Sequence, residues 1–361
     1  MTPTIFHPLA DLMARRGTVV IDGAMSTALE ALGADLNDPL WTAKVLLEKP
    51  ELITEVHRRY YEAGADVAIT ASYQATPAGF ARKGLDAARS RELITLTAKL
   101  AVTARDEAAA RHPDRAADLL VAGSIGPYGA YLADGSEYRG DYRLTDEEFS
   151  LFHRDRIEAL VEGGVDLFAV ETQPKLSEVL VALDEIERVG KTAWVTFSIR
   201  DGDRLADGTS LSEAAGKVGE RDCVDAVGMN CGPREIVAPA LDRLAESGKP
   251  LIVYPNSGET YDPSTKTWHS PVHGAGWDSF VPLWERKGAR CIGGCCRTPT
   301  SRRSPSSSAA DFRDRPTIKI PAPKLRRRDC RFRGFCRTAQ SAFQRSTAPS
   351  PPSSSSTVRR R

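Results

Sequence analysis

Three cysteines in this 361-residue sequence follow short apolar segments that run into glycine, and such an arrangement suits metal binding. Cys295 and Cys296 are adjacent and follow Gly293-Gly294, whereas Cys231 comes at the end of Val227-Gly228-Met229-Asn230. Neighbouring thiolates bind soft or borderline metal ions, and glycine lets the backbone fold closely around such an ion. Three thiolates with one open position are typical of a catalytic zinc, because structural zinc sites usually fill all four positions with protein ligands.

The same cysteines are also compatible with roles that need no metal. Cys295 and Cys296 could form a strained vicinal disulfide, or their adjacency could be a coincidence. A single buried cysteine such as Cys231 is usually a small hydrophobic residue of a core. Cys223 and Cys291 are interpreted in this way, as packing residues.

The composition is that of a globular protein, with 41% hydrophobic residues, enough for a substantial core. No segment has the pattern of a signal peptide, and none approaches the about 18 apolar residues of a membrane span. We therefore expect a cytoplasmic protein without a membrane partner. In that compartment, seven cysteines favour metal binding or catalysis over disulfides.

The net charge of +1 hides a difference between two parts of the chain. Residues 301–361 contain 16 Lys and Arg but 3 Asp and Glu, whereas residues 1–300 contain 33 basic and 45 acidic residues. Residues 301–361 are rich in serine, proline and arginine and lack apolar periodicity, so we expect a disordered tail. A shift of the reading frame after Arg297 would explain this change, and it would remove the last helix of the domain that residues 1–300 form.

Residues 1–300 alternate between apolar segments and helical patterns. Strands are expected at 18–25, 66–70, 119–123, 165–170, 192–199, 226–231, 251–254 and 291–296, and helices at 26–32, 50–63, 90–111, 145–162, 175–188, 210–218, 234–247 and 277–287. Ser90 is the expected N-cap of one helix, and Thr145 with Glu148 forms the capping-box pattern of another. Eight strands, each but the last followed by a helical pattern, predict a parallel sheet that closes as a (β/α)₈ TIM barrel, here without the helix that would follow the last strand.

Polar residues follow the predicted strands, where the loops of such a barrel form the active site. They are Asp22, Ser72, Ser124, Glu171, Asn230, Cys231, Asn256, Cys295 and Cys296. Polar residues unrelated to function would be scattered over both ends of the barrel. Cys231 and the cysteine pair are separated by one intervening strand, a distance that a metal ion can bridge.

Several motifs in this order resemble the homocysteine S-methyltransferase family over residues 15–298. They are Asp22-Gly23-Ala24-Met25, Ser72-Tyr73-Gln74-Ala75-Thr76, the segment SIGPYGAYLADGSEY at 124–138, Glu171-Thr172, Asn230-Cys231 and Gly293-Gly294-Cys295-Cys296. The segment at 124–138 resembles the branch of the family that uses S-methylmethionine or S-adenosylmethionine. No cobalamin or folate domain accompanies these motifs.

The resemblance implies Zn²⁺ held by Cys231, Cys295 and Cys296, with the thiol of L-homocysteine as the fourth ligand. A methyl group would pass from a sulfonium donor to this thiol and form methionine. The residues that the resemblance places around homocysteine are Asp22, Ala24, Met25, Ser72, Tyr73, Glu171 and Asn230. Glu171 and Asp22 would receive the amino group, and Asn230 would also hold Cys231 in place.

Tyr128, Tyr131 and Asp134 are expected to face the donor, because a sulfonium charge suits aromatic rings and carboxylates. Simpler roles stay open for all these residues: Asp22 and Glu171 as helix caps or rim ion pairs, Asn230 as a turn residue, and the tyrosines as packing residues.

Two other functions are compatible with the sequence. The chain could be a betaine-type homocysteine methyltransferase, or a catalytically impaired barrel whose basic tail binds polyanions. Arg326-Arg327-Arg328 would attract phosphates, but clustered charge without aromatic residues gives non-specific, salt-sensitive association. We therefore expect small-molecule substrates and no specific nucleic-acid partner. The sequence does not specify an oligomeric state.

Overall fold

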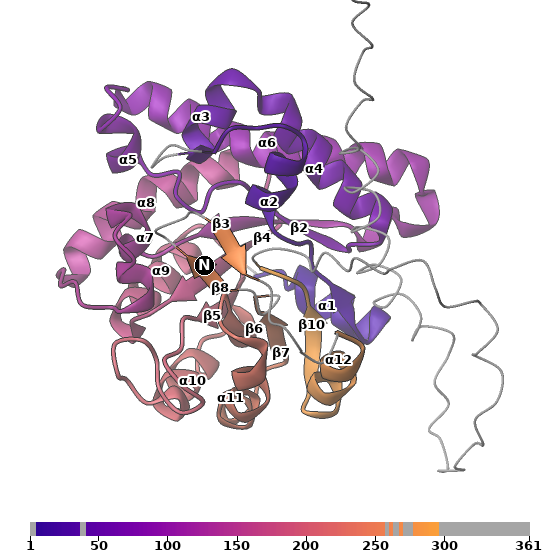
Figure 1. Ribbon diagram of the computed structural model, residues 1–361, viewed down its shortest axis with the longest axis vertical. Coiled ribbons are helices and arrows are strands. Elements are labelled where there is room, and N and C mark those ends of the chain that lie inside the picture. Colours follow the sequence, from indigo (N-terminus) through magenta and orange to yellow (C-terminus); the bar gives the residue numbers. More distant parts are fainter. Residues whose placement is uncertain (1–4, 37–40, 257–259, 263–266, 270–276, 296–361) are drawn as a thin grey trace, which may run out of the picture.

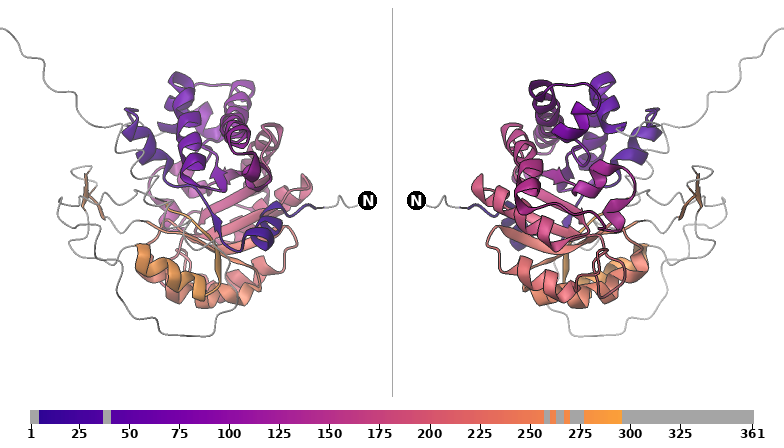
Figure 2. Two further views of the ribbon diagram at one scale, coloured as in Figure 1. Left: turned by 90° about the vertical axis from the view of Figure 1, so that its right-hand side faces the viewer. Right: turned by 90° about the vertical axis from the view of Figure 1, so that its left-hand side faces the viewer.

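Eight parallel strands form one sheet in the computed structural model, which describes residues 5–36, 41–256, 260–262, 267–269 and 277–295 (Figures 1 and 2). Their order is β1-β10-β7-β6-β5-β4-β3-β2. The strands are β1 (Val19–Val20), β2 (Val67–Ile69), β3 (Leu120–Ile125), β4 (Leu167–Gln173), β5 (Ala193–Phe197), β6 (Val224–Asn230), β7 (Leu251–Tyr254) and β10 (Ala289–Ile292). A separate antiparallel pair, β8 (Thr260–Asp262) and β9 (Thr267–His269), follows β7.

The sheet closes into a barrel between its first and last members. A parallel bridge joins Ile21 to Val67, and the amide of Asp22 donates to the carbonyl of Val67 at 2.9 Å. The amide of Asp66 donates to the carbonyl of Val20 at 2.8 Å. The predicted (β/α)₈ TIM barrel is therefore confirmed for the part of the chain that the structure describes. The predicted loss of the eighth helix and the predicted disordered tail at 301–361 concern residues outside the described ranges.

Helices surround the strands (Figure 1). They are α1 (Pro8–Arg16), α2 (Met25–Ala31), α3 (Trp41–Glu48), α4 (Pro50–Ala63), α5 (Pro77–Ala81), α6 (Ala87–Arg111), α7 (Tyr128–Leu132), α8 (Asp146–Glu162), α9 (Leu176–Arg188), α10 (Leu211–Gly219), α11 (Val237–Leu244) and α12 (Trp277–Arg286), with short 3-10 turns η1 (Pro113–Asp118), η2 (Ser136–Tyr138), η3 (Arg234–Ile236) and η4 (Ala245–Ser247). In the described ranges, no helix combines the length and the apolar character that crossing a membrane requires.

The N-termini of α8 and α6 test the two predicted helix caps. The capping box of α8 is confirmed: Thr145 Oγ1 accepts from the amide of Glu148, and Glu148 Oε2 accepts from the amide of Thr145. The expected N-cap at Ser90 is wrong, because α6 begins one turn earlier. There the side chain of Asp86 accepts from the amide of Arg89 at 2.8 Å, while Ser90 Oγ donates to the carbonyl of Asp86.

Two buried layers stabilise the barrel. One lies between strands and helices, and the other fills the barrel interior, where Trp194 and Ile252 are fully buried. Helix α1, which was not among the expected elements, contributes Leu9 and Leu12 to this interior core. A helix thus closes the end of the barrel at which the strands begin, and the opposite end is left for the site.

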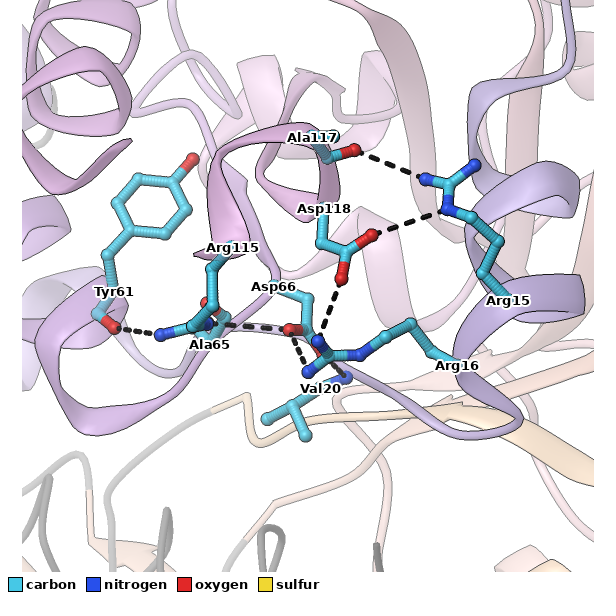
Figure 3. A network of polar contacts seen from close by, with 9 residues as sticks. All are labelled: Arg15, Arg16, Val20, Tyr61, Ala65, Asp66, Arg115, Ala117 and Asp118. Atoms are coloured by element: carbon cyan, nitrogen blue, oxygen red, sulfur yellow. Dashed lines mark hydrogen bonds and ion pairs between the residues drawn. The ribbon is translucent and has the colours of Figure 1, made fainter. Parts of the chain in front are cut away.

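A buried ion-pair network fastens α1 to this closed end (Figure 3). Asp66, which is 1% exposed, accepts from Arg16 Nη2 at 2.9 Å and from the amide of Val20 at 3.1 Å. Arg115 Nη2 lies 3.4 Å from the same carboxylate, and Arg16 Nη1 also donates to Asp118 at 2.8 Å. Polar groups at the amino ends of barrel strands usually serve stability, which is the role that we assign to this network.

Replacing Asp66 by asparagine is expected to lower the free energy of unfolding by about 3 kcal/mol. The change leaves the nearly buried guanidinium of Arg16 with less countercharge, and breaking a buried ion pair from one side is strongly destabilising. Chemical denaturation measures the effect. The exposed pair of Asp242 with Lys287 provides the control, because Asp242→Asn should change stability by about 1 kcal/mol or less. Equal effects of the two substitutions would contradict the assignment.

Candidate functional site

Cys231 and Cys295 meet at the open end of the barrel. Cys231 follows β6 and Cys295 follows β10, and the structure joins them by a disulfide with Cα atoms 5.5 Å apart. Residues 64 positions apart in the sequence therefore converge on one rim, across the intervening β7. Cys296, the third predicted ligand, lies outside the described residues.

Backbone contacts between the strand ends bring the two cysteines together. The amide of Cys231 donates to the carbonyl of Tyr254 at 3.3 Å, and the amide of Cys295 donates to the carbonyl of Pro255 at 3.0 Å. Gly293 passes so close to β1 that a Cβ there would lie 2.9 Å from the carbonyl oxygen of Asp22. The glycine is therefore required for the last strand to approach the first, which places Cys295 beside Asp22.

Asn230 connects the end of β6 with the end of β4. Its Oδ1 accepts from the amide of Thr172, and its Nδ2 donates to Thr172 Oγ1, both at 2.8 Å. Thr172 and Cys231 both adopt positive φ angles, 57° and 49°, which are uncommon for residues with a side chain and typical of functional sites. Asn230 Nδ2 also lies 3.4 Å from Cys231 Sγ, within the range of a weak hydrogen bond to sulfur.

Asp22 and Glu171 are two buried carboxyl groups at the same rim. Burial raises the pKa of Glu171 to about 7, although Ser124 Oγ donates to Glu171 Oε1. Burial also raises the pKa of Asp22 well above its usual value, despite a hydrogen bond from the amide of Ile69, and the nearby charge of Glu171 raises it further.

No lysine or arginine of the described residues pairs with either carboxyl group. His57 Nδ1 lies 3.9 Å from Asp22 Oδ2, but burial lowers the pKa of His57 to about 3, so this ring is neutral. Burial disfavours the charged form of a carboxyl group, and a nearby positive group favours it. The pair is therefore suited to receive a cationic group from a ligand.

A cavity of about 290 Å³ contains both the sulfurs and the carboxyl groups. Its lining includes eight of the predicted site residues: Asp22, Ala24, Met25, Tyr73, Glu171, Asn230, Cys231 and Cys295. Ser72 is fully buried behind the wall, where its hydroxyl donates to the carbonyl of Ser124. The lining residues that were not singled out include Gln74, Tyr138, Thr172 and Tyr254. The first three lie within the motifs that carry the family resemblance, whereas Tyr254 had no signal beyond ending a strand.

The three predicted donor-facing residues lie outside the lining of this cavity. Tyr128 and Tyr131 pack around Phe152, with ring centroids 5.0 and 5.7 Å from it. Asp134 is exposed and accepts from the amide and hydroxyl of Ser136. Ring packing turns Tyr128 and Tyr131 toward α8, and their expected contact with the donor stays a prediction. Tyr138 and Tyr73 are the tyrosines of these motifs that line the cavity.

The donor set of this rim fits a metal that prefers sulfur. The Cys231 and Cys295 sulfurs occupy adjacent positions, and the Asn230 amide is placed to stabilise a thiolate at Cys231. Among the described residues, no group of three His, Cys, Asp or Glu side chains could hold a metal ion. Cys296, the predicted third sulfur ligand, follows Cys295 directly in the sequence.

Comparisons with known proteins point to one family. The family model described as homocysteine S-methyltransferase matches residues 19–302. The homocysteine S-methyltransferase of Escherichia coli strain K12 is 51% identical over 295 residues, which are 81% of this chain and 95% of that protein. Crystal structures of the homocysteine methyltransferase MmuM from Escherichia coli are 47% identical with a TM-score of 0.73. The oxidised form covers 81% of this chain and 96% of that one, and the metallated form covers 80% and 95%.

The matched region contains the whole described barrel from β1 onward, both cysteines and both buried carboxyl groups. Identity near one half over nearly the full length of a relative leaves no room for a different domain in this region. The chain belongs to the homocysteine S-methyltransferase family.

Proposed function

We propose that this chain transfers a methyl group from a sulfonium donor, S-methylmethionine or S-adenosylmethionine, to the thiol of L-homocysteine and so forms methionine. The observation that carries the proposal is the joint presence, in one cavity, of two cysteine sulfurs and two buried carboxyl groups without a countercation. The first pair suits a thiol-binding metal, and the second suits the amino group of an amino acid. Homocysteine carries both a thiol and an amino group.

The proposed metal is zinc, held by Cys231, Cys295 and Cys296. When bound, zinc keeps a thiol deprotonated at neutral pH. A free thiol, with a pKa near about 8.5, is mostly protonated at that pH. The chain's own residues fix the amino acid: Asp22 and Glu171 receive its ammonium group, and Asn230 orients Cys231. We place the reaction in the cytoplasm, where cysteine thiols stay reduced.

The methyl transfer needs no acid or base at the methyl carbon. The carbon-sulfur bond of the sulfonium breaks, and its electron pair stays on the departing sulfur, which leaves as a neutral thioether. The new bond forms between the methyl carbon and the homocysteine sulfur, which has lost its proton. The chain therefore has to orient two sulfur atoms in line, and alignment of this kind is a large part of enzymatic rate enhancement.

The test supplies the reduced, zinc-loaded protein with L-homocysteine and one donor at a time: S-methylmethionine, S-adenosylmethionine or betaine. Methionine should form with at least one sulfonium donor and not with betaine. Methionine from betaine alone would replace the proposed donor class, and no methionine from any donor would overturn the proposal.

The disulfide makes metal binding depend on reduction. A disulfide sulfur lacks the charge of a thiolate, so the joined Cys231 and Cys295 cannot both serve as ligands. We expect the oxidised protein to bind less than about one tenth of an equivalent of zinc, and the protein treated with a thiol reductant to bind about one equivalent. Zinc analysis after gel filtration measures this, with methionine formation in parallel. Equal zinc in both samples would contradict the assignment of the two ligands.

A further inference from the structure

The cavity has two tyrosines that come from outside the barrel strands. Tyr73 follows β2, and Tyr138 ends η2 in the segment after β3. Side chains at strand ends are fixed by the barrel itself, whereas these two depend on what holds their loops. The described residues behind the loops contain a buried polar network that the proposed mechanism does not use.

We propose that Glu178, His153 and Arg156 form a positioning unit that holds the aromatic wall of Tyr73 and Tyr138 for the methyl donor. This inference rests on the proposed function, because it assigns the wall to the sulfonium substrate, and it moves Tyr73, which was expected around homocysteine, to the donor. Aromatic faces attract such cations, while the sulfurs and carboxyl groups of the same cavity suit homocysteine.

Glu178 is the acceptor of the unit. It lies fully buried in the first turn of α9 and accepts three hydrogen bonds. The donors are the amide of Tyr128 at 2.6 Å, the hydroxyl of Tyr142 at 2.5 Å and the imidazole Nε2 of His153 at 3.0 Å. The first of these bonds holds the backbone of the segment that leads to Tyr138.

Arg156 is the donor of the unit, and it is fully buried in α8. Its Nη2 donates to the carbonyl of Gly126 at 2.7 Å and to His153 Nδ1 at 2.6 Å, and its Nη1 donates to the carbonyl of Tyr73 at 3.4 Å. One guanidinium therefore ties the end of β3 to the residue that follows β2, which is itself part of the cavity wall.

His153 connects the two charges as a neutral ring. Arginine can only donate, so Nδ1 accepts from Arg156 and the proton is on Nε2, where it is donated to Glu178. Burial lowers the pKa of His153, which agrees with this neutral form. The unit thus contains one positive and one negative charge with a fixed direction of hydrogen bonding.

Two glycines transmit the position of the unit to the tyrosines. At Gly126 a Cβ would lie 2.5 Å from the carbonyl of Tyr73 and 2.7 Å from its ring. At Gly129 a Cβ would lie 2.6 Å from the amide of Glu137, the residue before Tyr138. The backbone held by Glu178 and Arg156 is therefore in direct contact with both parts of the wall, so a shift of that backbone moves the wall.

The same pair of helices offers a matched control. Glu185 also lies on α9 and is 5% exposed. It accepts from Ser150 Oγ at 2.6 Å, from Arg154 Nη2 at 2.8 Å and from Arg188 Nε at 2.8 Å, all on α8 or α9. Glu185→Gln therefore removes the same charge from the same helix pair without touching the loops.

The experiment measures kcat and the KM of each substrate for the zinc-loaded wild type, Glu178→Gln and Glu185→Gln, with S-methylmethionine and L-homocysteine. We expect Glu178→Gln to raise the donor KM by about tenfold or more, because small displacements of positioning groups have large kinetic effects, while the homocysteine KM changes less than about twofold. Glu185→Gln should change neither KM by more than about twofold. Tyr142→Phe, which removes one of three donors to Glu178, should raise the donor KM by about threefold.

Equal increases of both KM values in Glu178→Gln, or an unchanged donor KM, would overturn the positioning role. If Glu178→Gln does not fold, as judged by circular dichroism, Tyr142→Phe decides, and an unchanged donor KM in that variant would overturn the role as well. An inactive wild type would instead overturn the proposed function, so the two failures are distinguishable.

Discussion

Replacing Cys231 by serine is expected to abolish both zinc binding and methyl transfer. The change removes one of the proposed sulfur ligands and leaves a hydroxyl, which is a poor ligand for a thiol-preferring metal at neutral pH. Loss of a residue that only supports a metal ligand costs about 10–100-fold, so loss of a ligand itself should cost more than about 100-fold in kcat/KM. Zinc content of the reduced protein and methionine formation are the two measurements, and Cys295→Ser should behave in the same way.

Cys223→Ala provides the control for this substitution. Cys223 is a free, fully buried cysteine just before β6, and it does not line the cavity. Its variant should bind about one equivalent of zinc and keep its turnover, with a modest loss of stability from the removed sulfur. A Cys231→Ser protein that keeps its zinc and its activity would show that the zinc is held by other residues.

The barrel could be predicted because its strands have a simple pattern. Leu251–Tyr254 is a short, wholly buried apolar strand between turn signals, and Pro50–Ala63 has a proline at its start and Gly64 at its end. Both elements appear with the expected bounds. Helix α1 was missed because its role is tertiary: Leu9 and Leu12 enter a core that exists only when all strands are in place.

The site could be predicted only where it lies at strand ends. Three residues, Asp22, Glu171 and Cys231, lie in the last positions of buried strands or just after them. The topology of a parallel barrel brings such positions to one rim. The orientation of Tyr128 could not be predicted, because it depends on the ring of Phe152 from another helix. Glu178 had no signal in the sequence, since a carboxylate in the first turn of a helix is common on surfaces.

Glu171→Gln is expected to raise the KM for homocysteine by at least about 100-fold, with little change in the KM for the donor. Removing one partner of a buried charge pair costs about 3–5 kcal/mol, and each 1.4 kcal/mol is about tenfold in affinity. The amide keeps the size of the side chain and its contact with Ser124, so the cavity should keep its shape. Steady-state kinetics of the zinc-loaded variant with each substrate varied in turn measure the two KM values.

The pH dependence of stability tests the same residue without catalysis. Burial raises the pKa of Glu171 to about 7 in the folded protein, above its usual value of 4.5, so the folded state holds this proton more tightly than the unfolded state. The resulting stabilisation is fully present below about pH 4.5 and is lost as the pH rises through about 7, an effect on the order of 3 kcal/mol.

In the absence of ligand, wild type should therefore lose stability relative to Glu171→Gln between about pH 5 and pH 8, as measured by chemical denaturation at each pH. Homocysteine should offset this loss in the wild type but not in Glu171→Gln, because its ammonium group favours the charged carboxylate. Asp225→Asn is the control: burial also raises the pKa of Asp225, but this residue pairs with His7 and Thr192 away from the cavity, so homocysteine should still offset the loss in that variant. Parallel stability curves for wild type and Glu171→Gln would mean that Glu171 is already compensated in the free protein, and the amino group of homocysteine would then need another partner.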